Sequence, residues 1–327
     1  MKKEKMELLE KIIFILLIAG VLVVIHFNNG ISSYIANYLM PSYYSIPAID
    51  VHEHIALGEN QTADLIRIMD KLNISKMVLL DTPSVTFGKD DKFGDYDQNV
   101  EIQLKMKAQY PGRFLVLYTY PPWDTGGPNK IEKYYKEGID GLKFYNGVIY
   151  NMLGPINSTA MYRAYEKARE LNLSVLIHVE SQDSEQLAEF EQVLRDFPNV
   201  TFICPHMCAA ESHLDLLETL LDKYPNLYTD VSAWQRVGTF AVKMPDEYRQ
   251  FIIKHSDRIM YATDLVKSND VNDQLDAKAW FACERDLLEK GQFSCFLEDG
   301  VLRGLHLPHD VLVQIYQLTP KKVYANA

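Results

Sequence analysis

Eight short apolar runs, each followed by a stretch with helical spacing, constrain the fold of this 327-residue chain more than any other feature. The runs occupy residues 46–52, 76–81, 114–120, 141–145, 174–179, 200–206, 227–231 and 258–264. The helical stretches occupy residues 62–72, 98–110, 130–137, 159–171, 184–197, 211–224, 245–255 and 273–290. Strands that alternate with helices form parallel sheets, and helices that cover such strands leave them almost continuously apolar. The pattern therefore predicts an α/β protein.

A closed (β/α)8 barrel and an open doubly wound sheet share this local pattern. No glycine-rich phosphate loop follows the first apolar run, and polar residues stand at the ends of several later runs. Both observations favour the barrel, because barrel enzymes build their active sites where the strands end. We therefore predict one (β/α)8 TIM barrel over residues 46–327, closed by a helix in the tail at 305–324.

The N-terminal segment predicts a membrane anchor. A lysine-bearing stub at residues 1–11 precedes an apolar run without charges, which we delimit as residues 12–28 and follow with a linker at 29–45. As a helix, the uninterrupted apolar residues 12–27 would rise about 24 Å, a little less than the ~30 Å hydrocarbon core of a bilayer. Lysines before the run favour a cytoplasmic N-terminus and a catalytic domain outside the cytoplasm. The alternatives are a cleaved signal peptide, which would release a secreted domain, and a buried helix.

Charge and cysteine usage narrow the function classes. The formal net charge of -11 argues against a nucleic-acid partner, because phosphate binding needs clustered lysine and arginine. The four cysteines are too sparse and too irregularly spaced to predict a disulfide framework. They stand at Cys204, Cys208, Cys283 and Cys295. We interpret Cys204 and Cys208, which flank His206, as small buried residues at a strand end, with metal ligation as the alternative.

The sharpest local motif is a pair of histidines, His52 and His54, at the end of the first apolar run. Residues two apart in an extended strand point to the same side, so both imidazoles can approach one metal ion. Further polar residues follow the ends of later runs, namely Lys143, His178, His206 and Asp264. In a closed barrel these ends surround one mouth. The sequence therefore predicts a divalent metal centre there.

The order of these residues resembles that of the amidohydrolase superfamily, particularly its amidohydrolase-related branch. The resemblance extends from about residue 46 to residue 324. It implies that His52, His54 and Asp264 hold one metal, commonly zinc. It further implies that His178 completes a mononuclear site and that His206 acts as an acid or hydrogen-bond donor toward the substrate.

A second arrangement is implied by the same resemblance. Carbon dioxide would carbamylate Lys143, whose new carboxylate would bridge two metals, and His178 and His206 would bind the second of them. An unmodified lysine cannot serve, because its ammonium group is repelled by a divalent ion and has no lone pair to donate. Branch members that act as decarboxylases or lactonases often lack this lysine, so its presence favours hydrolysis with two metals.

These features predict a hydrolase that uses a metal-activated water on an amide, ester, lactone or related bond of a small molecule. We place Asp264, His206 and Lys143 among the catalytic residues, with Asp264 accepting the proton of the water. One alternative is a nonoxidative, metal-dependent decarboxylase of an aromatic or unsaturated acid. Another is a catalytically inactive, membrane-attached binding protein. An oligomer is compatible with the sequence, which does not specify one.

Overall fold

The computed structural model describes residues 44–55, 59–81, 96–122, 124, 126–147, 154–266 and 273–324. Contacts divide the chain into two units, Met1–Tyr43 and Tyr44–Ala327, and every described residue belongs to the second. The predicted stub, the predicted anchor and nearly all of the predicted linker lie outside the described residues. Within the described ranges, none of the helices combines the length and the apolar character needed to cross a bilayer.

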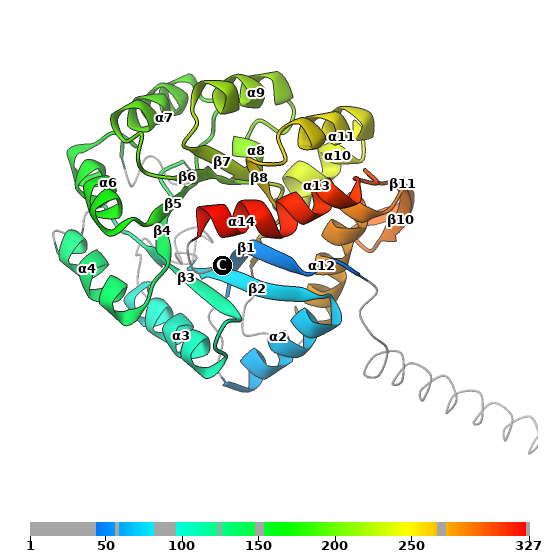
Figure 1. The fold of residues 1–327 in the computed structure, drawn as a ribbon, viewed down its shortest axis with the longest axis horizontal. Coiled ribbons are helices and arrows are strands. Elements are labelled where there is room, and N and C mark those ends of the chain that lie inside the picture. Colours follow the sequence, from blue (N-terminus) through cyan, green and yellow to red (C-terminus); the bar gives the residue numbers. More distant parts are fainter. Residues whose placement is uncertain are drawn as a thin grey trace, which may run out of the picture. The chain divides into compact units, whose positions relative to one another are not determined.

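The described unit is built on a ring of parallel strands (Figure 1). The strands are β1 (Ala48–His54), β2 (Ile74–Leu80), β3 (Phe114–Thr119), β4 (Gly141–Phe144), β5 (Ser174–Ile177), β6 (Phe202–Cys204), β7 (Leu227–Asp230) and β8 (Ile259–Met260). Each strand pairs with the next one along the chain, and a short strand β9 (Leu265–Val266) pairs with β1 and closes the ring. Strands β8 and β9 are the two parts of the eighth strand, separated at residues 261–264. The predicted (β/α)8 barrel is confirmed.

Helices surround this ring (Figure 1). They are α2 (Glu59–Lys71), α3 (Tyr96–Gln109), α4 (Gly127–Glu137), α6 (Thr159–Leu171), α7 (Ser184–Asp196), α9 (Leu214–Lys223), α11 (Pro245–Lys254) and α12 (Asp273–Glu289). Helix α6 begins as expected, because the Ser158 side chain accepts a hydrogen bond from the Met161 backbone. Helix α7 begins at Ser184, where the sequence predicted it, and Asp183 caps it. The Asp183 carboxylate accepts two backbone hydrogen bonds there, one more than a single cap needs.

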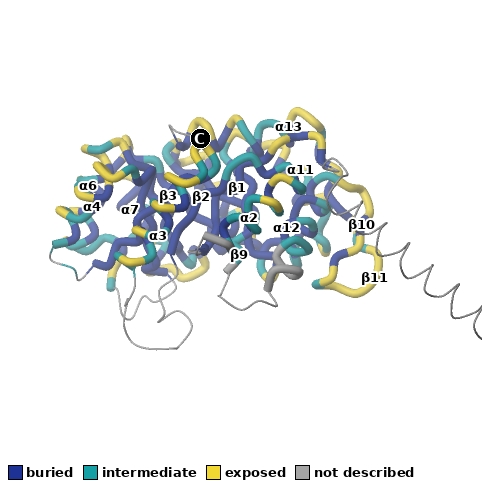
Figure 2. The backbone as a smooth tube through the Cα atoms, turned by 90° about the horizontal axis from the view of Figure 1, so that it is seen from below, coloured by how far each residue is buried: buried dark blue, intermediate teal, exposed yellow. Residues whose placement is uncertain are grey.

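The barrel interior is apolar and buried, as Figure 2 shows for the strands at its centre. On β1, Ile49 and Val51 belong to this interior cluster. A register irregularity between Asp50 and Glu53 interrupts the two-residue alternation of the strand. Beyond the irregularity, His52 and His54 at the end of β1 point toward the mouth of the barrel. Glu53, which lies between them, does not, and its carboxylate contacts the Thr263 hydroxyl.

The tail closes the opposite end of the barrel. It consists of α13 (His309–Val313), the π-helical segment η3 (Gln314–Leu318) and α14 (Thr319–Val323), so the helix begins four residues later than the predicted range. Val323 and Tyr324 enter the interior cluster, and the Ser174 hydroxyl at the start of β5 donates to the Val323 carbonyl at 2.6 Å. Tyr316 packs its ring against the Tyr261 ring, with centroids 5.1 Å apart. Because the tail covers the amino ends of the strands, the site can open only at their carboxyl ends.

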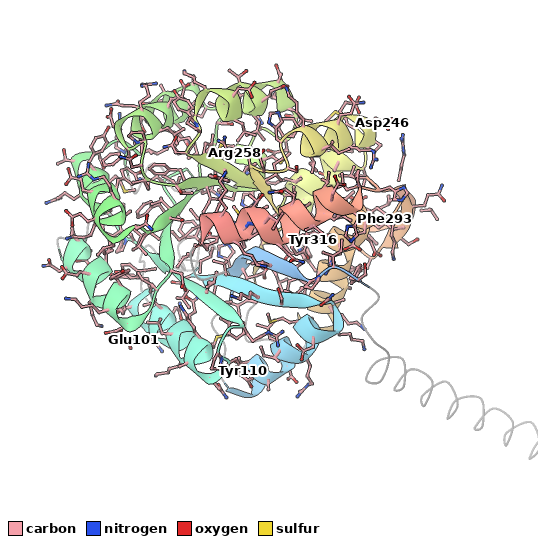
Figure 3. The ribbon with its side chains drawn as sticks, in the orientation of Figure 1. Glu101, Tyr110, Asp246, Arg258, Phe293 and Tyr316 are labelled. Atoms are coloured by element: carbon pink, nitrogen blue, oxygen red, sulfur yellow. A yellow bond between two sulfur atoms is a disulfide. The ribbon has the colours of Figure 1, made fainter. Side chains whose placement is uncertain are left out.

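Several short elements have no counterpart in the sequence pattern. A hairpin of β10 (Gln292–Cys295) and β11 (Glu298–Arg303) follows α12. A turn α8 (Pro205–Cys208) follows β6, and a π-helical segment η2 (Ala233–Gly238) with α10 (Thr239–Ala241) follows β7. The hairpin packs on η2 through the rings of Phe293 and Trp234, whose centroids are 6.1 Å apart; Figure 3 labels Phe293.

The cysteines are paired, which corrects the sequence-based interpretation. Cys204 bonds Cys208, and Cys283 bonds Cys295. Cys204 and Cys208 are buried at the end of β6, as interpreted, but the expectation that the cysteine spacing supports no disulfide framework is wrong, and this pairing excludes metal ligation by Cys204 or Cys208. Both bridges are local, joining residues 4 and 12 positions apart, and the fold rather than the spacing brings their Cα atoms to 4.8 and 5.3 Å.

Candidate metal centre

Histidine and aspartate side chains gather at the carboxyl ends of the strands. His52 and His54 end β1, His206 follows β6, Asp230 ends β7 and Asp264 follows β8. The three histidines are buried, Asp230 is fully buried, and Asp264 is partly exposed at the mouth. The barrel thus places at one mouth residues that are far apart in the sequence.

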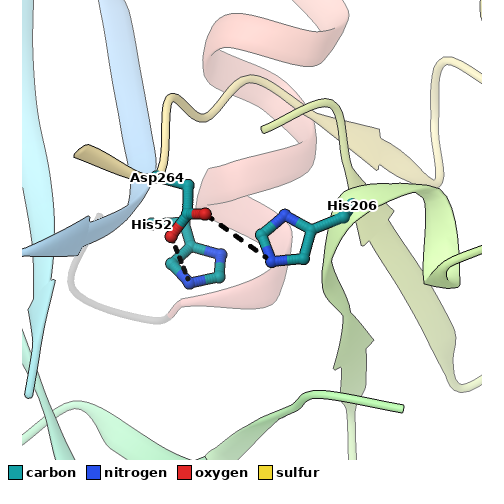
Figure 4. A group of neighbouring side chains, drawn as sticks. All are labelled: His52, His206 and Asp264. Atoms are coloured by element: carbon teal, nitrogen blue, oxygen red, sulfur yellow. Dashed lines mark ion pairs between the residues drawn. The ribbon is translucent and has the colours of Figure 1, made fainter. Parts of the chain in front are cut away.

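Asp264 lies at the centre of this group (Figure 4). Its Oδ1 atom is 2.8 Å from His54 Nε2 and 3.4 Å from His52 Nε2. Its Oδ2 atom is 3.8 Å from His206 Nε2. One ligand atom from each of His52, His206 and Asp264 lies within 4.8 Å of the other two. A cation placed among these atoms could contact several of them at once.

The orientation of the His52 ring is set by Asp230. His52 Nδ1 lies 3.2 Å from Asp230 Oδ2. Because a carboxylate only accepts hydrogen bonds, Nδ1 carries the proton and the Nε2 lone pair faces Asp264. A carboxylate behind a histidine in this way fixes the tautomer that a metal ligand needs.

The His54 ring has the same tautomer for a different reason. The Tyr145 hydroxyl donates to the Asp81 carbonyl at 2.5 Å. The Tyr145 oxygen can then accept a hydrogen bond from His54 Nδ1, which lies 3.0 Å away. The Nε2 lone pair of His54 therefore faces the centre too, only 3.1 Å from Nε2 of His52.

His206 completes the pattern through Ser232. The Ser232 hydroxyl donates to Asp230 Oδ1, so its oxygen accepts from His206 Nδ1 at 2.8 Å. Asp230 Oδ1 also accepts from the His206 backbone N–H at 3.0 Å. Asp230 therefore orients two of the three histidines. The sequence analysis missed this residue, although its place at the end of the seventh apolar run was a usable signal.

The charges at this centre fit a divalent cation. Burial lowers the pKa values of His52 and His54 and lowers that of His206 to about 4, so all three imidazoles are neutral near pH 7. Burial raises the pKa of Asp264, but Coulombic interactions with the His206 and His52 side chains and a hydrogen bond with His54 outweigh this and lower it below its ordinary value. Two imidazole lone pairs 3.1 Å apart repel one another unless positive charge lies between them. Neutral nitrogens around one carboxylate are the donor set that zinc takes in catalytic sites.

Lys143 lies near the end of β4, beside these ligands. Its Nζ atom lies 3.4 Å from His52 Nε2 and 4.5 Å from the centre of the Tyr145 ring. The side chain is fully buried, and burial lowers its pKa to about 7. The structure thus places Lys143 within the group that the sequence predicted.

In the wild-type protein, we expect the free energy of unfolding to rise between about pH 7 and pH 10.5 because of Lys143, and replacing Lys143 by methionine should abolish this rise. The folded protein releases the Lys143 proton near pH 7, whereas the unfolded chain retains it up to about pH 10.5. Between these values the unfolded chain binds the additional proton, so the free energy of unfolding rises with pH, by an amount on the order of a few kcal/mol. Urea unfolding of the metal-free proteins across this pH window measures the difference between variant and wild type. The exposed Lys136→Met variant should follow the wild-type curve, and a Lys143→Met curve parallel to wild type would contradict the expectation.

His178 lies beside the group but is engaged elsewhere. Its ring centroid is 5.1 Å from that of His206. Its Nε2 atom, however, donates to Glu180 Oε1 at 2.9 Å. Arg236 donates to both Glu180 oxygens and to Glu211, which fixes Glu180 in place. The predicted role of His178 as a metal ligand stays a prediction: Glu180 occupies Nε2 of His178 and leaves its Nδ1 lone pair for an ion, just as Asp230 occupies Nδ1 of His52 and leaves its Nε2.

Comparisons with known proteins extend these observations. The sequence profile of the amidohydrolase family, Amidohydro_2, matches residues 49–325. No functionally curated protein matches the chain. A candidate 2-pyrone-4,6-dicarboxylic acid hydrolase from Pseudomonas putida is structurally similar, with a TM-score of 0.58 and 13% sequence identity, over 86% of this chain and 99% of that one.

Two further solved structures have the same fold. A 4-oxalomesaconate hydratase from Rhodopseudomonas palustris has a TM-score of 0.54 and 15% identity, over 85% of this chain and 96% of that one. A 5-carboxyvanillate decarboxylase from Sphingomonas paucimobilis has a TM-score of 0.53 and 13% identity, over 86% of this chain and 99% of that one. At these identities the structural likeness shows the fold alone. Because the family profile covers the barrel from its first strand to its closing tail, this chain belongs to the amidohydrolase family.

Proposed function

We propose that this protein is a metal-dependent hydrolase that uses water to cleave an amide, ester, lactone or related bond of a small molecule. One observation carries the proposal, namely that three imidazole lone pairs and one carboxylate converge at the mouth of the barrel. Members of the family typically bind a divalent metal, which supports this interpretation. The structurally similar proteins include a candidate hydrolase, a hydratase and a decarboxylase.

His52, His54 and Asp264 would hold one divalent ion, with His206 on the other side of the carboxylate. Zinc suits this set of two nitrogens and one oxygen, because catalytic zinc sites combine three protein ligands with one open position. When bound, the ion would supply the Lewis acidity that polarises a substrate carbonyl and makes water a stronger acid.

The protein's own groups would manage the protons. Asp264 Oδ2 points away from the two β1 histidines and toward His206, so it can accept a proton from the attacking water. His206 can relay that proton, because its Nε2 lone pair faces the carboxylate at 3.8 Å. A pKa lowered to about 4 by burial makes protonated His206 a strong acid, which suits donation to the leaving group.

A second ion would require Lys143 to be carbamylated. The neutral amine is the form that reacts with carbon dioxide, and burial favours that form. The resulting carboxylate would join His178 and His206 in binding the additional ion. Intact-protein mass and metal stoichiometry, measured together, test this arrangement.

We also propose that residues 12–28 anchor the protein and that the barrel lies outside the cytoplasm, with cleavage and secretion as the alternative. The two disulfides support this placement, because disulfides persist in oxidising compartments and are rare in the cytosol. Protein taken from its native membrane should show no thiols that react with an alkylating probe before reduction. Four reactive thiols on the folded protein would contradict the placement.

The proposed reaction is tested on the full-length chain. Elemental analysis should find about one equivalent of zinc, iron or manganese. A panel of lactones, esters, N-acyl compounds and aromatic acids then separates the possible reactions. Hydrolysis products that disappear with a chelator and return with metal would support the proposal. Release of carbon dioxide from an aromatic acid would instead favour nonoxidative decarboxylation, and a folded protein without metal or turnover would favour a binding role.

A further inference from the structure

The turn that carries His206 has an unusual backbone. Four consecutive residues after Pro205 lie in the left-handed region, with φ of 55° at His206, 52° at Met207, 59° at Cys208 and 55° at Ala209. This conformation is sterically disfavoured for every residue type except glycine, and none of the four is glycine. Some interaction outside the turn must therefore hold it.

The Cys204–Cys208 disulfide spans this turn. Cys204 is the last residue of β6, and Cys208 is the third left-handed residue. Their Cα atoms are 4.8 Å apart, whereas the same four-residue step would reach about 13 Å in an extended chain. Both cysteines are fully buried. The bridge therefore excludes the extended forms that the backbone would otherwise prefer.

The same turn fixes His206 in the site. Its backbone N–H donates to Asp230 Oδ1 at 3.0 Å and its Nδ1 to the Ser232 hydroxyl at 2.8 Å. Its Nε2 then lies 3.8 Å from Asp264 Oδ2. If the backbone left the left-handed region at His206, the side chain would leave in another direction and these contacts could not coexist.

We propose that the Cys204–Cys208 disulfide is a positioning element of the active site, which holds His206 against Asp264 and makes turnover depend on an oxidising environment. This inference rests on the proposed hydrolase function. The two cysteines act through His206 and are positioning residues. A dithiol reductant that breaks the S–S bond would leave two protein thiols and become a disulfide itself, and the freed turn would release His206.

The chain offers a matched control for this inference. The variant Cys204→Ser with Cys208→Ser removes the bridge under His206. The variant Cys283→Ser with Cys295→Ser removes the bridge between α12 and β10. We expect the first variant to lower kcat by about 10-fold or more, the effect of losing support for a site residue. The control variant should keep kcat within about twofold of wild type, because neither α12 nor β10 carries any of the proposed metal ligands.

Glycine rescue separates positioning from general stability. Glycine adopts the left-handed conformation without steric penalty, so adding Ala209→Gly to the Cys204/Cys208 variant should restore part of the lost kcat. Adding Ala210→Gly, one residue beyond the left-handed stretch, should restore none of it. A wild-type kcat without the Cys204–Cys208 bridge would overturn the inference. Equal losses in both disulfide variants, or no rescue by Ala209→Gly, would overturn it too.

The inference and the proposed function can fail separately. If wild-type protein binds no metal and hydrolyses nothing, the proposed function fails, and the turn is then followed by NMR of protein with ¹⁵N-labelled histidine. A His206 imidazole resonance that shifts without the bridge and returns with Ala209→Gly would retain the positioning role. An unchanged resonance would refute it.

Discussion

Replacing Asp264 by asparagine is expected to strip the bound metal and to lower kcat/KM by about 10³-fold or more. Asp264 approaches the Nε2 atoms of all three imidazoles. The amide of asparagine lacks the negative charge that balances a cation, and its NH2 group would compete for the lone pairs that otherwise face the metal. The same substitution removes the proposed proton acceptor. Elemental analysis and steady-state kinetics of the purified variant measure both effects.

A matched control comes from the protein surface. Asp246 forms an exposed ion pair with Arg303 at the rim of the molecule (Figure 3). Asp246→Asn makes the same chemical change far from the mouth, and exposed pairs of this kind contribute little to stability. Its metal content and kinetics should equal those of wild type. An Asp264→Asn variant that kept wild-type metal content would show that the metal, if one is bound, lies elsewhere.

Replacing Asp230 by asparagine should weaken metal binding by about 10- to 100-fold while leaving the ligands themselves in place. The Asp230 carboxylate accepts hydrogen bonds from the His52 ring, the His206 backbone and the Ser232 side chain. An amide in this position offers one donor in place of an acceptor. If the asparagine NH2 group faces His52, the His52 Nδ1–H loses its acceptor. If the NH2 group faces the other way, Ser232 and the His206 backbone N–H lose theirs.

Competition against a chelator of known affinity measures this loss. The histidine tautomers provide a second readout, because the ¹⁵N shifts of the His52 ring distinguish a protonated Nδ1 from a protonated Nε2. Wild-type protein should show the proton on Nδ1, and the variant should show a mixture. Unchanged metal affinity and unchanged tautomers in Asp230→Asn would contradict the role assigned to Asp230.

The architecture could be predicted from the sequence because it depends on local patterns. Apolar runs and helical spacing predicted all eight strands and the eight surrounding helices. The eighth run shows the limit of such a pattern. It continues without interruption to Asp264, but the strand breaks at residues 261–264, and Asp264 takes a φ of 58°. The apolar pattern predicts which residues are buried. Residues 261–264 are mostly buried although they form no strand, so the pattern could not predict the break.

The contacts that orient the ligands could not be predicted in this way. His52 and Asp230 are 178 positions apart, and only closure of the barrel makes them neighbours. The hydrogen bond between His178 and Glu180 involves near neighbours in sequence, but Arg236, which also holds Glu180, lies in η2 after a different strand. The spacing of the sequence predicted which residues reach the mouth of the barrel. The directions in which their ring nitrogens point could be known only from the folded structure.

The Cys204–Cys208 disulfide next to His206 could not be predicted from the sequence either. A four-residue separation of Cys204 and Cys208 suits several backbone conformations, and the left-handed turn that brings them together is disfavoured for each of its residues. Local propensity therefore points away from the observed structure. Such conflicts between local preference and fold are expected at functional sites.

Anomalous X-ray diffraction from a metal-loaded crystal tests most directly whether this mouth holds a metal. Data collected on either side of the absorption edge of zinc should give one strong peak among the Nε2 atoms of His52 and His54 and Oδ1 of Asp264. No peak there after soaking with zinc, or a peak outside the barrel mouth, would contradict the metal centre and the hydrolase that depends on it.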